Sequence, residues 1–559
     1  MLKKLPIYFL ALFFGGIPLL AQNTVGLLSN NPTKVSEGFN LIYPHNQSTV
    51  YLLNNCGEIT HKWEDDAALR PGNMAYLNDD GTLFKCKRLV SSAVNDRIWA
   101  GGGGETVELR TWENELLASF TLNNDKFRLH HDIAPLPNGN ALLIAWELKT
   151  GEEALAAGRD TSQLSQGEIW SERILEWNPN SNEIVWEWSV WDHLVQDFDA
   201  TKANYGVVAE HPELININYD EKEGHPDWLH INAIDYNEVL DQFVLSVPHF
   251  NELWIVDHST TQAEANSHTG GNSGKGGNLL YRWGNPAAYN QGTAADKKCF
   301  FQHDTHWINP KAAVGDDNFG KIALFNNRVA ENLSTGNILS TNYDPVTKNY
   351  TLAAGVFMPV NFAQVYAHPQ SATEVRASSS SVSSFQVLPN GNALLCAGRH
   401  GYSYEINAEN KVIWEYITPL KAGQAVAQGD ESLDINNNLT FRVKRYPVDH
   451  PALIGREMVG DGFIELNPDT EFCGTLSVNT VEVNSPEVLK VYPNPAQNWL
   501  SLDWQVNDTQ ELYLYDYLGR LEMTITKRDS ERILDISHLP RGMYFLSTTH
   551  QVIEKILVY

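Results

Sequence analysis

Cysteine is scarce in this chain of 559 residues, and the cysteines that are present stand far apart. There are five, at positions 56, 86, 299, 396 and 473, and no two of them form a Cys-x-x-Cys motif. This spacing argues against a thiolate zinc site. We expect at most one disulfide, and the sequence does not indicate which cysteines pair.

Basic residues are fewer than acidic residues in this chain, and long apolar runs are rare. The chain has 40 Lys and Arg against 68 Asp and Glu, a formal net charge of −28. An acidic protein repels phosphate backbones, so nucleic acid is not an expected partner. Beyond the N-terminal residues no apolar stretch is long enough to cross a bilayer, so we expect no membrane span.

The N-terminus carries the one strongly apolar segment of the chain. Lys3 and Lys4 precede an apolar run that ends in the small-residue sequence Leu20-Ala21-Gln22. This pattern predicts a secretory signal peptide over residues 1–21. A membrane anchor is the alternative, and the shortness of the run disfavours it. We therefore expect a protein that leaves the cytoplasm.

What the chain has in abundance is Trp, Tyr, Asn and Gly, which favour short strands and tight turns. The sequence LPNGNALL occurs twice, at 136–143 and 388–395, and related strand–turn–strand segments recur between and before the two copies. Second hairpins that close on Trp or Tyr alternate with them, at 172–188 and 403–416. Two hairpins make one four-stranded unit, so the repeat predicts an all-β fold with a six-bladed β-propeller over residues 22–475. A large β-sandwich is the alternative.

The C-terminal residues form a separate unit in this interpretation. A polar linker at 476–490 leads to short alternating strands, which predict a small β-sandwich over 491–559. The segments YPNP at 492–495, YDYLGR at 515–520 and LPRGMYFL at 539–546 resemble the C-terminal sorting domain of the type IX secretion system. The resemblance implies a Bacteroidetes-type bacterium, the type IX machinery as a partner, and export through periplasm and outer membrane to a secreted or cell-surface location.

A propeller brings equivalent positions of successive repeats to one central channel. When the repeats are aligned on Pro137 and Pro389, His131, His303 and Ser383 stand six residues before the shared point. With a longer turn, Asn232 takes the same place in a further repeat, and His230 lies two residues earlier. We expect these five side chains to converge. The alternative is that each histidine only satisfies backbone groups or a bound water.

The central region also resembles the bacterial arylsulfate sulfotransferases that use no phosphoadenosine cofactor. The resemblance covers most of residues 40–470 and rests on RLHHDIAPLPNGN, DWLHINAID, FFQHDTHW and NKVIWEY. It implies a six-bladed propeller, an aryl sulfate donor, a phenolic acceptor and a transiently sulfurylated histidine. By motif, His303 is that nucleophile, and His131, His230, Asn232 and Ser383 match the remaining site positions. No cofactor and no metal are implied.

One family position differs in this chain. An arginine usually follows the HIN histidine by about 17 residues, and Pro248 stands there instead, next to His249. His249, Arg328 or Arg399 are the candidates to replace the missing cation. Two other functions stay open: a metal-dependent hydrolase or lyase in which His131, His230 and His303 hold zinc, and a surface binding propeller without catalysis.

Several segments near these motifs have plainer interpretations. In FFQHDTHW, period-two alternation puts His306 on the strand face opposite His303, so we assign structural roles to His306 and to Asp304. The glycine-rich sequence at 100–106 lacks the context of a phosphate loop and predicts a flexible turn. The basic segment at 441–451 has two interpretations: it lies near the channel and helps to bind anions, or it is a solvated strand face, which we favour. The natural donor and acceptor and the oligomeric state are not indicated.

Overall fold

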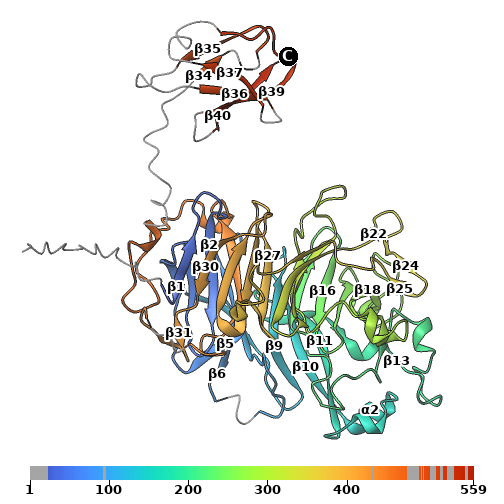
Figure 1. The fold of residues 1–559 in the computed structure, drawn as a ribbon. Coiled ribbons are helices and arrows are strands. Elements are labelled where there is room, and N and C mark those ends of the chain that lie inside the picture. Colours follow the sequence, from blue (N-terminus) through green and yellow to red (C-terminus); the bar gives the residue numbers. More distant parts are fainter. Residues whose placement is uncertain are drawn as a thin grey trace, which may run out of the picture. The chain divides into compact units, whose positions relative to one another are not determined.

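The computed structural model describes residues 23–91, 96–429 and 433–474, and shorter stretches within 490–558. The expected signal peptide, at 1–21, lies outside the described residues, as does the expected linker except for Lys490. The chain separates into two compact units, 1–473 and 474–559, and each is described by itself (Figure 1).

The described part of the first unit is built mainly from six antiparallel sheets of four or five strands. The first three sheets are β33 (Thr440–Pro447), β2 (Gly38–Pro44), β3 (Val50–Leu53), β4 (Ile59–Trp63); β5 (Leu69–Leu77), β6 (Leu83–Leu89), β7 (Thr106–Arg110), β8 (Leu116–Thr121); and β9 (Phe127–Pro135), β10 (Ala141–Thr150), β11 (Glu168–Asn178), β12 (Glu183–Ser189). The other three are β15 (Ala233–Asn237), β16 (Gln242–Val247), β17 (Glu252–Asp257), β18 (Leu279–Trp283); β19 (His303–Trp307), β20 (Lys321–Ala330), β21 (Leu333–Ser340), β26 (Gln364–Tyr366); and β27 (Ser383–Val387), β28 (Ala393–Ala397), β29 (Tyr402–Ile406), β30 (Val412–Ile417), β1 (Gly26–Asn30).

The repeated LPNG sequence forms the tight turn between the first two strands of two sheets. In β9–β10 the amide of Leu136 donates to the carbonyl of Asn140 over 2.8 Å, and in β27–β28 Leu388 and Asn392 are joined in the same way over 2.8 Å. The glycine of each turn, Gly139 or Gly391, has a φ near +85°. A residue with a Cβ is strained there, which explains why glycine stands at this point of both repeats.

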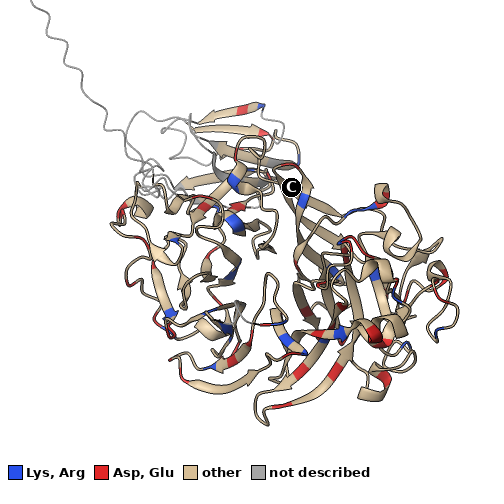
Figure 2. Ribbon diagram, turned by 90° about the horizontal axis from the view of Figure 1, so that it is seen from below, with Lys and Arg blue, Asp and Glu red and all other residues tan. Residues whose placement is uncertain are grey.

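The six sheets follow one another around a ring. The innermost strand of each sheet is the one named first above: β33, β5, β9, β15, β19 and β27. β5 contacts β9, β9 contacts β15, β15 contacts β19, β19 contacts β27, β27 contacts β33, and β33 contacts β5 again. Figure 2 shows the sheets of the first unit from below. Both ends of the unit take part in closing this ring. The N-terminal β1 pairs with β30 of the sixth sheet, and the C-terminal β33 pairs with β2 of the first.

Aspartates on the inner strands tie neighbouring sheets together. Their carboxylates accept backbone N–H groups of the next inner strand: Asp132 from Ile234 at 3.2 Å, Asp235 from Trp307 at 2.8 Å, and Asp304 from Phe385 at 3.0 Å. Because an orphaned buried backbone group is costly, these bonds fix how far each inner strand slides against the next. Asp304 thus has the structural contact that its sequence position suggested.

Large aromatic side chains fill the space between sheets. Trp63, Trp146, Trp177, Trp188 and Trp254 are all fully buried. Helices are few among the described residues: α2 (Gly151–Ala156), α3 (Gln262–Ala265) and the short 3-10 turns η1 (Thr161–Gln163), η2 (Val190–His193), η3 (Val208–Glu210), η4 (Pro286–Tyr289), η5 (Ala294–Asp296), η6 (Val375–Ala377), η7 (Gly398–His400), η8 (Pro451–Leu453). None of the helices in the described ranges is long and apolar enough to cross a membrane. Two-residue strands complete the unit: β13 (Leu194–Val195), β14 (Ile215–Asn216), β22 (Tyr343–Asp344), β23 (Asn349–Tyr350), β24 (Leu352–Ala353), β25 (Val356–Phe357), β31 (Leu420–Lys421), β32 (Gln424–Ala425).

The second unit holds two described sheets, β34 (Lys490–Tyr492), β35 (Trp499–Asp503), β38 (Leu534–Asp535), and β37 (Leu521–Ile525), β36 (Leu512–Asp516), β39 (Gly542–Ser547), β40 (Val552–Val558). Leu500 and Leu502 from the first sheet share one apolar cluster with Leu512, Leu514 and Ile556 from the second. The two sheets therefore pack on a common core.

The cysteines behave as the prediction of at most one disulfide requires. Cys56 and Cys473 form a disulfide, and Cys86, Cys299 and Cys396 are free and buried. This bond joins the turn between β3 and β4 to the last residue of the first unit.

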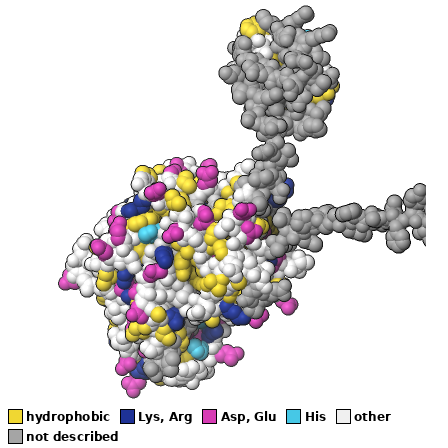
Figure 3. All heavy atoms as spheres, turned by 90° about the vertical axis from the view of Figure 1, so that its left-hand side faces the viewer, with side chains coloured by type: hydrophobic (Ala, Val, Ile, Leu, Met, Phe, Trp, Pro, Cys, Tyr) yellow, Lys and Arg dark blue, Asp and Glu magenta, His cyan; other side chains and the backbone are white. Residues whose placement is uncertain are grey.

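The interpretation of the basic segment 441–451 as a solvated strand face is wrong. Arg442 is 7% exposed and Arg445 is 2% exposed, because β33 is the innermost strand of its sheet and both arginines pair with buried carboxylates. Figure 3 shows Asp and Glu side chains scattered over one face of the protein, with Lys and Arg side chains among them.

Candidate active site

Three of the predicted histidines come into direct contact at the inner end of the third and fourth sheets. His131 lies on β9, His230 precedes β15, and His249 follows β16. The ring centroids of His131 and His230 are 4.5 Å apart, and those of His230 and His249 are 4.9 Å apart. His131 and His249 are buried, and the side chain of His230 keeps 12% of its surface exposed.

His303, at the start of β19, joins this cluster through two phenylalanines. The ring of Phe301 lies 5.7 Å from His303 and 6.2 Å from His230, and Phe441 lies 6.2 Å from His303 and 6.1 Å from His131. His303 is 1% exposed. Neither phenylalanine was predicted, although Phe301 stands in the FFQHDTHW motif.

Both ring nitrogens of His303 have defined partners. Nδ1 lies 2.8 Å from Asn327 Oδ1, which can only accept, and the amide of Val382 donates to Nε2 over 3.1 Å. The proton therefore belongs on Nδ1, and the lone pair belongs on Nε2. Asn327 was not predicted, because it lies on β20 and no motif marks it.

The charge states of the four histidines differ. Burial lowers the pKa of His303 to about 3 and that of His249 to about 3, and burial with four neighbouring histidines holds the pKa of His131 well below its usual range. These imidazoles are neutral near pH 7. Burial also acts to lower the pKa of His230, but the Asp227 carboxylate, 2.6 Å from Nδ1, raises it above its ordinary value. His230 is thus the member of the cluster that holds a proton most readily.

Strained backbone positions surround the cluster. His131, His230, Phe301 and Val382 all have φ between +43° and +57°, a left-handed region that residues other than glycine rarely adopt. Val382 is β-branched, for which this conformation is especially unfavourable. Such residues gather at functional sites, where the surrounding structure holds them in place.

The glycine-rich turn at 100–106 supports His131 directly, which the prediction of a flexible turn missed. The amide of His131 donates to the carbonyl of Gly102 over 2.8 Å. A Cβ at Gly102 would lie 2.0 Å from His131 Nε2, and φ at Gly102 is +83°. Only glycine allows the backbone to pass so close to this imidazole.

The predicted amide and hydroxyl are buried beside His303. Asn232 donates from Nδ2 to the carbonyl of Gln302 over 2.9 Å, and within the described part of the chain its buried Oδ1 has no hydrogen-bond partner. Ser383 accepts from Nδ2 of Asn327 over 3.2 Å, so it reaches His303 through that amide.

Arg328 and Arg399 meet at a serine-rich loop near the same site. Arg328 donates from Nε to the carbonyl of Ser380 over 2.8 Å, and Arg399 donates from Nη1 to the hydroxyl of Ser380. The Arg328 guanidinium lies 3.7 Å from the ring centre of Phe301. Arg328 is exposed and Arg399 is half-buried, and among the described residues neither has a carboxylate within 4 Å. Their positive charge is left for another anion.

Arg442 was not among the predicted site residues, although a place near the channel was the less favoured interpretation of its segment, 441–451. Its Nε lies 2.7 Å from Asp304 Oδ1, and its Nη2 lies 2.9 Å from Asp132 Oδ2. These aspartates directly follow His303 and His131, so one buried cation holds two histidine-bearing strands together. A sequence signal for this pairing was present, because HHD and QHD both place an aspartate directly after the histidine.

His306 and His303 have different surroundings. Nδ1 of His306 lies 2.8 Å from the carbonyl of Asp304, and the His306 side chain is 24% exposed. The pairing of β19 with β20 shifts register between His303 and His306, so the strict period of two used in the sequence argument does not hold across this segment.

Three residues lie close enough to hold a metal ion, and they are not the three named in the metal-dependent alternative. Within the described ranges, one ligand atom from each of Asp227, His230 and His249 lies within 4.8 Å of the others. The zinc set of the metal-dependent alternative, His131, His230 and His303, is not gathered in this way. Two imidazoles and a carboxylate are ligands that zinc accepts.

Comparisons with known proteins identify two regions. Residues 114–442 match the family model Arylsulfotransferase (ASST), and residues 490–558 match the Secretion system C-terminal sorting domain. The sorting domain indicates export to the cell surface or secretion. Among curated proteins the chain finds no match.

Similar solved structures are distant. A protein of unknown function from Bacteroides caccae is 10% identical with a TM-score of 0.35, covering 74% of this chain and 99% of its own. The Dos1 propeller is 9% identical with a TM-score of 0.29, covering 80% and 86%, and a streptogramin B lyase is 11% identical with a TM-score of 0.32, covering 77% and 96%. The family model, which spans more than half of the chain, is decisive: this protein belongs to the arylsulfotransferase (ASST) family.

Proposed function

We propose that the protein transfers a sulfuryl group from a phenolic sulfate ester to a phenolic acceptor, with His303 as the covalent carrier. Membership of the family supports aryl sulfotransfer without a phosphoadenosine cofactor. The observation that carries the proposal for His303 is its buried neutral imidazole, whose tautomer Asn327 fixes with the lone pair on Nε2. A neutral imidazole with an available lone pair is a competent nucleophile near pH 7.

The architecture that we propose is a six-bladed β-propeller, in which the six sheets are the blades. The contacts between successive inner strands support it. In this arrangement β9, β15, β19 and β27 line one channel, and the reaction takes place at the end where the histidines meet. The two packed sheets of the C-terminal unit are proposed to form its β-sandwich.

In the first half-reaction His303 Nε2 attacks the sulfur of the donor. The N–S bond forms as the bond from sulfur to the phenolic oxygen breaks, and the leaving phenolate takes the proton of the His230 imidazolium. His230 suits this role because Asp227 keeps it protonated while its neighbours are neutral. His131 and His249 donate or accept hydrogen bonds without adding charge.

In the second half-reaction the acceptor phenol gives its proton to His230, which is now neutral, and its oxygen attacks the sulfur of the sulfohistidine. The N–S bond breaks, and the electron pair returns to His303 Nε2. The cycle is ping-pong, and each proton that His230 gives is recovered from the acceptor. Phe301 and Phe441 offer aromatic surface for the two aryl groups.

The amide of Val382 caps the nucleophile before the donor arrives. It donates to His303 Nε2, the atom that must attack, so this hydrogen bond has to be given up in the first step. The same N–H group, held in a strained left-handed conformation, can then donate to a sulfuryl oxygen. Arg328 and Arg399, anchored on Ser380 of the same loop, supply the positive charge.

These arginines are also the residues that we propose to replace the cation missing at Pro248. His249, adjacent to Pro248, is neutral because burial lowers its pKa to about 3, so it cannot replace a cation. Arg328 and Arg399 have no carboxylate partner within the described residues and lie next to Phe301 and the Ser380 loop. We assign the sulfate-binding charge to them and a hydrogen-bonding role to His249, Asn232 and Ser383.

The test is release of 4-nitrophenol from 4-nitrophenyl sulfate by the purified full chain, with and without phenol and after chelator treatment. We expect release that requires phenol and survives the chelator. His303→Ala should lose at least about a thousandfold in rate, because the nucleophile is gone. Mass spectrometry of wild-type protein treated with donor alone should place one sulfuryl group on the peptide that carries His303.

His306→Ala is the matched control and should retain activity near the wild-type level, since its imidazole contacts Asp304, at the carbonyl and more distantly at the carboxylate, and none of the residues assigned to sulfuryl transfer. Release that needs no phenol and stops with the chelator would instead support a metal-dependent hydrolase built on Asp227, His230 and His249. No release and no modified histidine under any condition would leave a binding propeller as the better description.

A further inference from the structure

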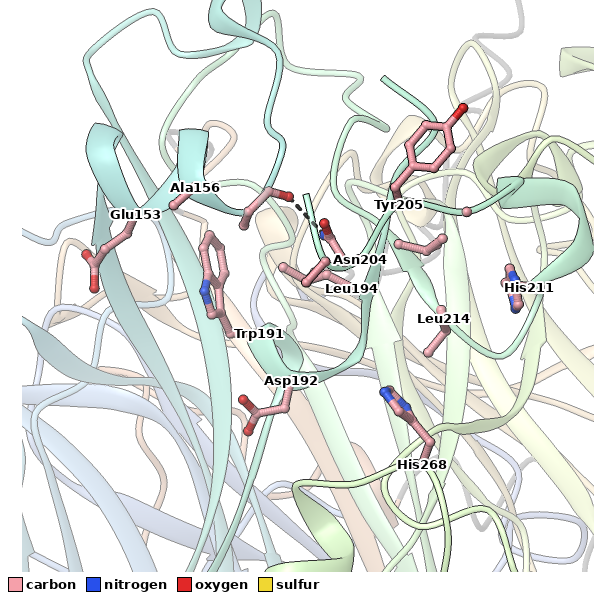
Figure 4. A pocket seen from close by; sticks show the side chains of 14 residues that line it. Glu153, Ala156, Trp191, Asp192, Leu194, Asn204, Tyr205, His211, Leu214 and His268 are labelled. Atoms are coloured by element: carbon pink, nitrogen blue, oxygen red, sulfur yellow. Dashed lines mark hydrogen bonds between the residues drawn. The ribbon is translucent and has the colours of Figure 1, made fainter. Parts of the chain in front are cut away.

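A second cavity lies away from the histidine cluster. Its volume is about 680 Å³, and it is formed by α2, η2, β13, the loop at 203–206, residues 211 and 214, and His268 (Figure 4). None of the residues assigned to sulfuryl transfer lines it. A cavity of this size suits a small ligand or a few units of a polymer.

The floor of the cavity is apolar and its walls carry aromatic rings. Leu194 and Val195 of β13 are buried beneath it, and Leu214 lies beside them. Trp191, at the second position of η2, is partly exposed, and Tyr205 keeps 51% of its surface exposed. Exposed aromatic rings over a buried apolar floor offer flat surfaces for a ligand to stack on.

Polar groups with free hydrogen-bonding capacity line the cavity beside these rings. In the described part of the chain, the Asp192 carboxylate, the Trp191 indole N–H and the Tyr205 hydroxyl form no hydrogen bond with another residue. His268 Nδ1 lies 2.7 Å from Asn278 Oδ1, so its proton is on Nδ1 and its Nε2 is an acceptor. Figure 4 shows Asp192 and His268 on either side of the space below Leu194 and Leu214.

The chemistry of the lining narrows the class of ligand. Asp192 and Glu153 repel anions, so an aryl sulfate does not suit this cavity. A wholly apolar ligand would bury the polar groups without hydrogen bonds, which is unfavourable. A cation would be repelled by the Lys149 ammonium, which lies 5.1 Å over one face of the Trp191 ring, whereas a neutral ring can stack on the other face. A neutral ligand that is rich in hydroxyl groups meets none of these objections.

We propose that this cavity binds a neutral oligosaccharide. Sugar rings stack their C–H faces on Trp191 and Tyr205, and their hydroxyl groups donate to Asp192 and His268 and accept from the indole N–H. Because the protein is exported to the cell surface or secreted, it meets extracellular glycans. The site is independent of the proposed sulfuryl transfer, and binding here would hold the protein on a glycan-bearing surface.

The test uses the full chain and four neutral hexasaccharides, from cellulose, xylan, starch and laminarin, with binding measured by isothermal titration calorimetry. We expect saturable binding of at least one of them. Trp191→Ala and Asp192→Asn should each weaken that binding by at least about tenfold. Circular dichroism shows whether each variant is folded.

Two controls separate this proposal from others. Trp499→Ala removes an exposed tryptophan from the C-terminal unit and should leave binding unchanged. His303→Ala should abolish sulfuryl transfer and also leave sugar binding unchanged, so either proposal can fail without the other. The oligosaccharide site is overturned if none of the four sugars binds, or if binding persists in Trp191→Ala. It is equally overturned if tetramethylammonium binds at Trp191 while the sugars do not.

Discussion

At the scale of single residues, identical side chains within one cluster take different charge states. His131, His249 and His303 are neutral near pH 7 because burial lowers each pKa, whereas Asp227 raises the pKa of His230 against the effect of burial. A nucleophile and a proton donor are needed together, and one residue type supplies both when its surroundings differ. The sequence marked the histidines, but Asp227 had no recognisable role until the fold placed it 2.6 Å from His230.

The first prediction at this scale concerns Arg442. Arg442→Met leaves Asp132 and Asp304 buried without their shared cation, so we expect the free energy of unfolding to fall by about 3–5 kcal/mol. Urea unfolding measures the change. Lys444→Met, a partly exposed position on the same strand, is the control and should change little. Adding Asp132→Asn and Asp304→Asn to Arg442→Met should recover part of the loss; a further fall would contradict the proposed pairing.

The second prediction is a pH dependence of stability due to His258. Burial acts to lower its pKa, but Glu176 at 3.0 Å and Asp241 at 2.9 Å raise it to about 9. The folded state therefore holds a proton between about pH 6.5 and 9 that the unfolded state releases. This stabilisation is fully present below pH 6.5 and is lost as the pH rises through 9.

The measurement is urea unfolding of wild-type protein and His258→Gln at pH 6 and pH 9.5. The wild-type protein should lose up to about 3 kcal/mol more than the variant over this range. Parallel losses in the two proteins would show that the His258 ion pairs contribute nothing.

At the scale of elements, the inner strands depart from regular pleating where they carry site residues. The register shifts in β9–β10 next to His131 and in β19–β20 next to His303. A bulge redirects side chains, so counting residues in steps of two fails there. The LPNG turns, by contrast, depend on local backbone conformation, and they were predictable because only glycine tolerates the φ that they need.

The third prediction tests the bond between the β3–β4 turn and the end of the first unit. Replacing both Cys56 and Cys473 by Ser releases a cross-link between residues separated by 417 positions. We expect the free energy of unfolding to fall by about 2–5 kcal/mol, because the unfolded chain gains freedom. Adding a reductant should lower the stability of the wild-type protein and leave the double variant unchanged. Equal stability of the two oxidised proteins would contradict the prediction.

At the scale of the whole molecule, each unit has a core of its own. The ring of sheets is closed by strands from both ends of the first unit, and the C-terminal strands share a separate apolar cluster. The second unit matches a sorting domain, so export and the chemistry of the cargo belong to different parts of the chain.

The fourth prediction follows from this division. A chain that ends at Gly474 keeps every described residue of the first unit, including the disulfide, and should fold with the thermal stability of that unit in the full chain. It lacks the sorting domain, so in a type IX-secreting host it should stay in the periplasm. Cell fractionation with an immunoblot locates it. Appearance of the truncated chain at the cell surface would show that other residues direct export.

The sequence by itself determined the all-β class, the family, the sorting domain and most of the residues that meet at the site. Repeats, turn glycines and motifs are patterns of neighbouring residues, so they can be identified in the sequence without knowledge of the fold. Only the tertiary structure decided the charge of each histidine, the partners Asp227 and Asn327, the buried role of Arg442 and the pairing of Cys56 with Cys473. These depend on burial and on contacts between residues distant along the chain, because a pKa or an ion pair is set by what surrounds a group in space.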